Sequence, residues 1–238
     1  MAKKKKIRAR PKKRRLPLDI CLNIFQTLII GFVGFYLTIQ SNQIANTQLQ
    51  LSLAQSIPQI RVNLRQVYNE EIERVDTHNI EISCEEGFFT NYKSYVISFL
   101  NIRGLEDYDI QIPLHGYWGA HSLTGNTSGT IETVLGWENH QKIKDVCEQI
   151  RQLTDKVVVF DVETYLRISY IDILGETQYR YYYVQPIRGT TIIDAEICES
   201  KIQLFDEAYF TDNHINLDTW TSEDLERLIL HYTTQVEQ

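Results

Sequence analysis

The sequence predicts a mainly β protein, in which an immunoglobulin-like β-sandwich follows a single transmembrane helix and a short helical stalk. Three observations predict this fold. Residues 20–39 contain no charged side chain. Beyond residue 58, apolar residues alternate with polar ones in about seven segments separated by turn residues, a pattern typical of sandwich strands. Two other segments have the 3.6-residue period of amphipathic helices, one inserted among the strands and one at the C-terminus.

The uncharged run, ICLNIFQTLIIGFVGFYLTI, predicts a membrane span within residues 16–39. As a helix its twenty residues would extend about 30 Å, the thickness of the hydrocarbon core of a bilayer. A buried core helix is the alternative, but such a helix normally carries a charged stripe on its exposed face, and this run has none. The composition therefore favours a span.

A basic tail, residues 1–15, precedes the span and predicts its orientation. The tail contains ten lysines and arginines, and the first one after the span is Arg61. Because cations beside a span are retained in the cytoplasm, we expect a cytoplasmic N-terminus and a C-terminal domain on the outer side of the membrane. A cleavable signal peptide would have a shorter apolar region and a small-residue cleavage site, which SNQIAN does not resemble. We therefore expect an uncleaved, single-pass signal anchor.

Small and polar residues share one face of the predicted span, at spacings of four, four, three and four. They are Asn23, Thr27, Gly31, Gly34 and Thr38. Faces of this kind allow transmembrane helices to approach closely and to hydrogen-bond to one another. The stripe predicts a possible homo-oligomer formed through the span. The span contains no ionisable residue that would indicate an ion path.

Residues 40–57 are rich in Gln and Asn, contain no Gly or Pro, and end before Pro58. They predict a helical stalk that continues the span. The β-sandwich domain is then expected over residues 58–238, about 180 residues and enough for one domain with a substantial core.

Strand patterns begin at Ile60 and recur along this domain, with apolar alternation that includes Tyr95, Ile97 and Phe99. The clearest pair is VETYLRISYIDILGETQYRYYYVQPI, two β-branched and aromatic runs joined around LGET. Gly175 in that connection can adopt the positive φ that a hairpin turn needs. Between residues 188 and 220 the pattern is ambiguous, and TTIIDAEICESKIQLF reads as one or two more strands.

Two amphipathic segments predict helices. In WENHQKIKDVCEQIRQLT the apolar face consists of Ile143, Val146, Cys147, Ile150 and Leu153, which makes Cys147 a core residue rather than a reactive thiol. In TSEDLERLILHYTTQVEQ, Thr221 and Asp224 have capping-box spacing. The expected buried residues of this second helix are Leu225, Leu228, Ile229 and Tyr232.

Charge and cysteine content exclude several classes. The chain has 24 basic and 31 acidic residues, so removing the ten tail cations leaves 14 − 31 = −17. A body this acidic repels a phosphate backbone, and we expect no nucleic-acid partner. The cysteines of the body, Cys84, Cys147 and Cys198, are widely spaced and form neither a CxxC pair nor a disulfide framework.

No catalytic signature occurs: the sequence lacks GxGxxG, GxxxxGK, HExxH and GxSxG. The segment HGYWGAHSLTGNTSGTIETVLGWENH concentrates the polar side chains of reactive types. Its candidate metal ligands are His115, His121, Glu132, Glu138 and His140, but their spacing matches no zinc signature. The simpler prediction for these residues is a solvated loop, with no metal and no cofactor.

The same segment supplies a candidate partner-binding loop, with Tyr117, Trp118 and Trp137 as possible aromatic anchors. The alternative is that these aromatic side chains cover the end of the sandwich.

Together these patterns favour a non-enzymatic, membrane-anchored interaction or ligand-binding module whose protein partner is unknown. An alternative is a membrane effector or sensor subunit that self-associates through its span. A second alternative is a metal-dependent hydrolase that uses His115, His121 and His140.

Overall fold

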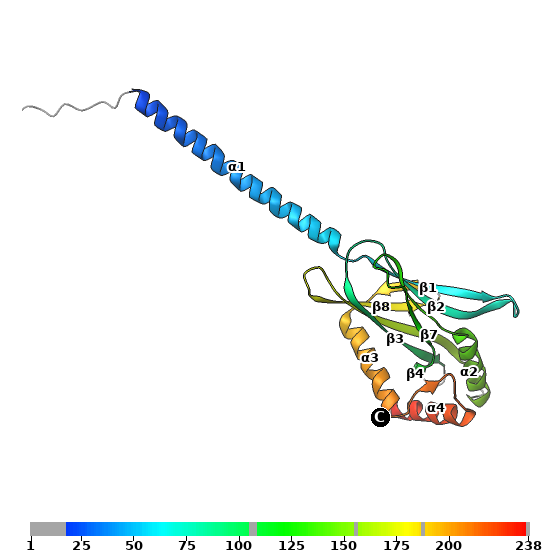
Figure 1. Cartoon of the computed structure of the whole chain (residues 1–238). Helices are drawn as coiled ribbons and strands as arrows, with labels where there is room; N and C mark the ends of the chain where they lie inside the picture. Colours follow the sequence, from blue (N-terminus) through cyan, green and yellow to red (C-terminus); the bar gives the residue numbers. More distant parts are fainter. Residues whose placement is uncertain (1–17, 105–108, 155–156, 187–188, 237–238) are drawn as a thin grey trace, which may run out of the picture. The chain divides into compact units, whose positions relative to one another are not determined.

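The structure is a computed structural model, and it describes residues 18–104, 109–154, 157–186 and 189–236. The predicted basic tail, residues 1–15, lies outside the described residues. A long apolar helix comes first, and the chain beyond it is mainly β-sheet with three shorter helices (Figure 1). The chain divides into two compact units, Met1–Ala54 and Gln55–Gln238.

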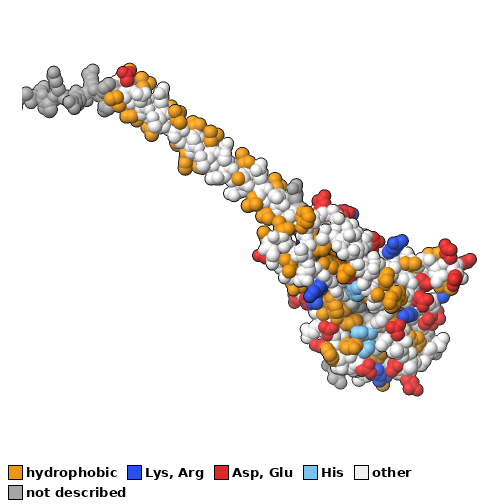
Figure 2. Space-filling view, viewed as in Figure 1, with side chains coloured by type: hydrophobic (Ala, Val, Ile, Leu, Met, Phe, Trp, Pro, Cys, Tyr) orange, Lys and Arg blue, Asp and Glu red, His pale blue; other side chains and the backbone are white. Residues whose placement is uncertain are grey.

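The first unit is formed by helix α1, Leu18–Ser56, whose 39 residues correspond to about 58 Å. Apolar side chains cover its surface (Figure 2), and the helix is long and apolar enough to cross a membrane. The predicted span and the predicted stalk form one continuous helix that ends two residues before Pro58. Within it, the hydroxyls of Thr27 and Thr38 donate to the carbonyls of Asn23 and Gly34, each at 2.8 Å.

The second unit contains two β-sheets. One sheet has the strand order β1-β2-β6-β5 and the other the order β10-β4-β3-β7-β8-β9. Their strands are β1 (Ile60–Asn69), β2 (Arg74–Cys84), β3 (Thr90–Arg103), β4 (Ile110–His115), β5 (His121–Leu123), β6 (Gly129–Val134), β7 (Val159–Ile171), β8 (Thr177–Gln185), β9 (Gly189–Ile192) and β10 (Ile215–Asn216). All neighbouring pairs are antiparallel except β10 and β4, which are parallel.

The two sheets pack face to face through a buried apolar cluster. Ile80 and Ile82 of the smaller sheet belong to the same cluster as Leu166, Ile168 and Val184 of the larger sheet. The chain passes from one sheet to the other after β2, after β4 and after β6. Sheet-on-sheet packing of this kind agrees with the prediction of a β-sheet body.

Two helices cover the remainder of the same face of the larger sheet. They are α2 (Asn139–Thr154) and α4 (Ser222–Val236), and both contribute to a cluster with β3 and β4. The predicted apolar face of α2 is confirmed except at Leu153, which is 38% exposed. The predicted capping box is also confirmed, because the Asp224 amide donates to Thr221 Oγ1 at 3.2 Å and the Thr221 amide donates to Asp224 Oδ2 at 3.0 Å.

The sequence left TTIIDAEICESKIQLF ambiguous, as one more strand or two. The structure has one strand at its start, β9 (Gly189–Ile192), whereas residues Ala195–Phe210 form helix α3. The helix begins after Asp194, and its buried residues recur with helical spacing. They are Cys198, Ile202, Phe205 and Ala208.

Helix α3 packs on the opposite face of the larger sheet, where Ile202 and Phe205 meet Ile97 and Phe99 of β3. As a result β3 is buried on both faces from Ile97 to Ile102, rather than on alternate residues as predicted for a half-buried strand. The larger sheet is therefore the middle layer of the second unit.

The predicted hairpin of residues 162–187 is confirmed as β7 and β8, which pair from Thr164↔Val184 to Ile171↔Thr177. Gly175 has φ +80° in the turn. The Asp172 carboxylate accepts the amides of Leu174 and Glu176 at 2.9 and 3.0 Å, which fixes the turn.

Candidate ligand-binding cleft

The structure separates the three aromatic residues of the predicted partner loop. Tyr117 is only 3% exposed and belongs to the core beneath α2. Trp118 is half-buried, and its Nε1 donates to Ser98 Oγ at 2.9 Å. Trp137 is 59% exposed, and its ring lies against Gly119. Because the segment is organised by β5 and β6 instead of forming a long loop, Trp137 alone of the three presents a large exposed surface.

The histidines of the predicted metal alternative also lie apart. The ring of His115 stacks with that of Phe205 at 4.5 Å between centroids, and the His140 ring lies 4.8 Å from that of His78. His121 Nδ1 contacts the buried Glu132 carboxylate at 2.5 Å. Among the described residues, no group of three His, Cys, Asp or Glu side chains is arranged to hold a metal ion.

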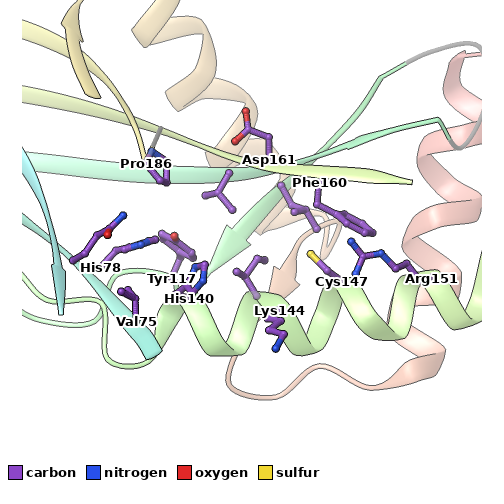
Figure 3. A pocket seen from close by; sticks show the side chains of 14 residues that line it. Val75, His78, Tyr117, His140, Lys144, Cys147, Arg151, Phe160, Asp161 and Pro186 are labelled. Atoms are coloured by element: carbon purple, nitrogen blue, oxygen red, sulfur yellow. The ribbon is translucent and has the colours of Figure 1, made fainter. Parts of the chain in front are cut away.

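A cleft of about 440 Å³ lies in the second unit. It is bounded by α2, by the β1–β2 hairpin, and by β3, β7 and the residue after β8 (Figure 3). Its lining residues are Gln66, Val75, His78, Leu100, Tyr117, His140, Ile143, Lys144, Cys147, Arg151, Phe160, Asp161, Val162 and Pro186. The volume lies within the range of about 300–1,000 Å³ typical of small-molecule sites.

Helix α2 supplies one wall of the cleft through residues spaced along one face. His140, Ile143, Lys144, Cys147 and Arg151 follow one another at intervals of three, one, three and four residues, so they form a continuous stripe. The facing wall consists of apolar side chains from the larger sheet. This arrangement gives an apolar middle with polar groups at its two ends.

At one end, His78 and His140 gather beside Tyr117 (Figure 3). His78 is 3% exposed, and its Nδ1 has no hydrogen-bond partner among the described residues. Burial, followed by the charge of His140, lowers the pKa of His78 to about 4. Burial and the nearby cations Lys144 and Arg74 also lower the pKa of His140. Both imidazoles are therefore neutral at pH 7, and each carries one donor and one acceptor.

A strained turn holds this end of the cleft in place. Trp137 and Glu138 have φ values of +42° and +60°, which non-glycine residues rarely adopt. The turn places the fully buried Asn139 against β2, where its Oδ1 accepts the His78 amide at 2.8 Å and its Nδ2 donates to the His78 carbonyl at 3.1 Å. The beginning of α2 is thereby fixed to the strand that carries His78.

At the other end, the Arg151 guanidinium lies 4.9 Å from the centroid of the Phe160 ring. Cys147 lies between the two ends, and burial raises the pKa of its thiol to about 12. The thiol is therefore protonated and behaves as an apolar lining group at neutral pH.

Comparison with protein-family models, with curated proteins and with solved structures gave no match. The chemistry of the cleft therefore has to be derived from its own residues. Its apolar walls, neutral imidazoles and terminal cation suit binding of a small molecule.

Sequence patterns contained part of this site. The α2 stripe is visible in the sequence as an amphipathic helix, although attention to its apolar residues overlooked Lys144 and Arg151, and His140 was considered only as a metal ligand. His78, Phe160 and Val162 gave no local signal, because they join the cleft only through the packing of distant strands.

Proposed function

We propose that the chain is a membrane-anchored, non-enzymatic binding module, whose second unit takes a small ligand in the cleft between α2 and the sheets. One observation carries the proposal: His78 belongs to the lining, and among the described residues its buried Nδ1 has no hydrogen-bond partner. Buried polar nitrogens are normally hydrogen-bonded, so an imidazole of the lining without such a bond marks a place where a ligand could supply it.

The anchor in this proposal is α1, in the orientation that leaves the N-terminus in the cytoplasm and the second unit outside. Its support is the length and apolar surface of the helix together with the ten cations before it and the absence of any Lys or Arg between the span and Arg61.

We further propose that the body is a β-sandwich of immunoglobulin-like style to which α3 adds a third layer. The support is the face-to-face packing of two mostly antiparallel sheets and the three passages of the chain between them. The parallel pair β10–β4 is an addition to that style.

The second candidate function is an effector or sensor subunit that self-associates in the membrane. The polar and small stripe of α1 favours it: a Cβ at Gly31 or Gly34 meets no other atom of the chain within 4 Å, so another helix has room to approach there.

Cys147 provides a site-specific test of the binding proposal. The full chain in lipid nanodiscs is treated with methyl methanethiosulfonate, and modification of each cysteine is followed by peptide mass spectrometry with and without n-decanol. We expect decanol to slow modification of Cys147 because it occupies the cleft.

Cys198 serves as an internal control, since it is also buried but lies on α3, outside the cleft. Slowing at both cysteines, or at neither, would contradict binding in the cleft.

A further inference from the structure

The charged groups of the cleft favour a negatively charged ligand. Its lining holds two cations, Lys144 and Arg151, and one carboxylate, Asp161, which gives a net charge of +1 with both histidines neutral. Asp161 accepts a hydrogen bond from Gln185 Nε2 at 3.1 Å, and in Figure 3 its carboxylate points away from α2. The carboxylate is thus partly satisfied by protein.

Arg151 is the cation placed to meet a ligand. In the part of the chain that the structure describes, no carboxylate lies within ion-pair distance of its guanidinium. The contact with the Phe160 ring orients the guanidinium plane, and an oriented guanidinium matches a carboxylate or phosphate through two parallel hydrogen bonds. Lys144, by comparison, has its Nζ 3.8 Å from the Glu148 carboxylate.

The middle of the cleft is apolar. Leu100, Ile143 and Val162 line it together with the protonated Cys147 thiol. The volume of about 440 Å³ lies within the range of small-molecule sites, which suits a ten-carbon probe.

We propose that the ligand is a small anionic amphiphile, whose acid group pairs with Arg151 and whose apolar body lies along Ile143, Cys147 and Val162 toward His78. This inference rests on the proposed function and specifies the ligand class of the same cleft. The imidazoles of His78 and His140 lie at the far end of the lining, with their ring centroids 4.8 Å apart.

The test compares ten-carbon probes of different charge on the full chain in nanodiscs, with the rate of Cys147 modification as the readout. The probes are decanoate, decyl phosphate, n-decanol and decyltrimethylammonium. We expect Arg151→Gln to raise the decanoate concentration that gives half-maximal protection by about tenfold or more, because a charge-assisted hydrogen bond is lost. The decanol concentration that gives half-maximal protection should stay the same. The probes partition differently into the lipid, so the protection by each probe is compared between the variant and the wild-type protein, which cancels that difference.

Arg65→Gln is the matched control, because Arg65 is exposed like Arg151 and lies next to Gln66 on β1, but is not part of the lining. Arg151→Lys, which keeps the charge but not the planar fork, should lie between wild type and Arg151→Gln. A larger effect of Arg151→Gln on decanoate indicates a carboxylate ligand, and a larger effect on decyl phosphate indicates a phosphate ester.

Three results would overturn the assignment. Equal protection by decanoate and decanol, unchanged in Arg151→Gln, would leave the binding function standing and remove the ligand class. Stronger protection by decyltrimethylammonium would indicate a cationic ligand selected by Asp161. Protection by none of the four probes would overturn the binding function as well.

Discussion

Buried polar side chains of the second unit are of two kinds: in some, every polar atom is hydrogen-bonded to protein groups, and in others one atom is not. Glu132 is 1% exposed and accepts hydrogen bonds from Tyr92 OH at 2.6 Å and from Ser94 Oγ at 2.8 Å, besides its contact with His121. Among the described residues, His78 Nδ1 and His115 Nε2 are buried without a hydrogen-bond partner, and of these two residues His78 lines the cleft. This contrast supports a structural role for Glu132 and a binding role for His78.

Removing the Glu132 carboxylate should destabilise the second unit. Glu132→Ala leaves Tyr92, Ser94 and His121 without their shared acceptor between the two sheets, and we expect a loss of about 3–5 kcal/mol in the free energy of unfolding. Glu132→Gln, which keeps one acceptor oxygen, should lose less. The measurement is urea unfolding followed by tryptophan fluorescence, which reports on the second unit because Trp118, Trp137 and Trp220 all belong to it.

The exposed Glu226→Ala on α4 is the control and should change stability by less than about 0.5 kcal/mol. A Glu132→Ala protein as stable as this control would show that the network does not stabilise the fold.

The neutral state of His78 predicts that acid destabilises the second unit. Its pKa is about 4 in the folded protein and near 6.5 when unfolded, so the unfolded chain binds more protons between these values. Stability is therefore complete above pH 6.5 and falls as the pH decreases toward 4. We expect His78 to account for about 2–3 kcal/mol of that loss after allowance for solvent screening.

His78→Leu should therefore flatten the dependence of unfolding free energy on pH between 7 and 4.5. Part of the slope should remain, because burial lowers the pKa of His115 to about 4 as well. An unchanged slope in His78→Leu would contradict the assignment of His78 as a buried neutral base.

At the level of elements, the sequence predicted those whose pattern is local. The face of α2, the Thr221–Asp224 capping box and the turn at Gly175 were predictable because each depends on residues within a few positions of one another. Helix α3 was not predictable. The β-branched residues of β9 come almost directly before its first turn, so the change from the strand period to the helix period after Asp194 is hard to recognise.

The cleft could not be predicted, because its residues extend from Gln66 to Pro186 and meet through tertiary packing. The same holds for β3, whose burial on both faces depends on α3, an element about 100 residues further along the chain. A single sequence gives the faces of elements but not the elements that cover them.

The stripe of α1 predicts that close packing in the membrane needs small side chains. Gly31→Leu should weaken association of the full chain in bilayers, and Asn23→Leu should remove interhelical hydrogen bonds worth roughly 0.6–2 kcal/mol each. Leu is a good helix former, and beyond the backbone of the helix itself a Cβ at Gly31 meets nothing within 4 Å, so the effect of Gly31→Leu reports on another chain. The measurement is crosslinking in native membranes.

Ile30→Leu and Val33→Leu, which change similar side chains on other faces of α1, should leave crosslinking at the wild-type level. Equal crosslinking in all four variants would show that the stripe reflects composition, and the self-association alternative would lose its support.

At the scale of the whole molecule, charge separates the tail from the body, with ten cations before the span and a net charge of −17 beyond residue 15. This separation supports the proposed orientation and also means that the chain beyond the tail has an excess of acidic side chains. Electrostatic attraction to an acidic ligand therefore has to be local, which gives Arg151 its importance in the cleft.

The orientation can be tested through one cysteine introduced at Ser200, an exposed position on α3. The native cysteines of the second unit interfere little because Cys84, Cys147 and Cys198 are buried. Burial raises the pKa of the Cys147 and Cys198 thiols to about 12 and about 11, which keeps them protonated and slow to react. Because the body is expected outside, Ser200→Cys should react with a membrane-impermeant maleimide in sealed cells.

The unsubstituted chain, labelled in parallel, corrects for any reaction of Cys21 in α1. Replacing the ten cations of the tail by neutral residues should give a mixture of orientations, because they supply nearly all of the charge bias across the span. Protection of Ser200→Cys in sealed cells, with full reaction after lysis, would place the second unit in the cytoplasm. The cleft would then have to draw its ligand from the inner side of the membrane.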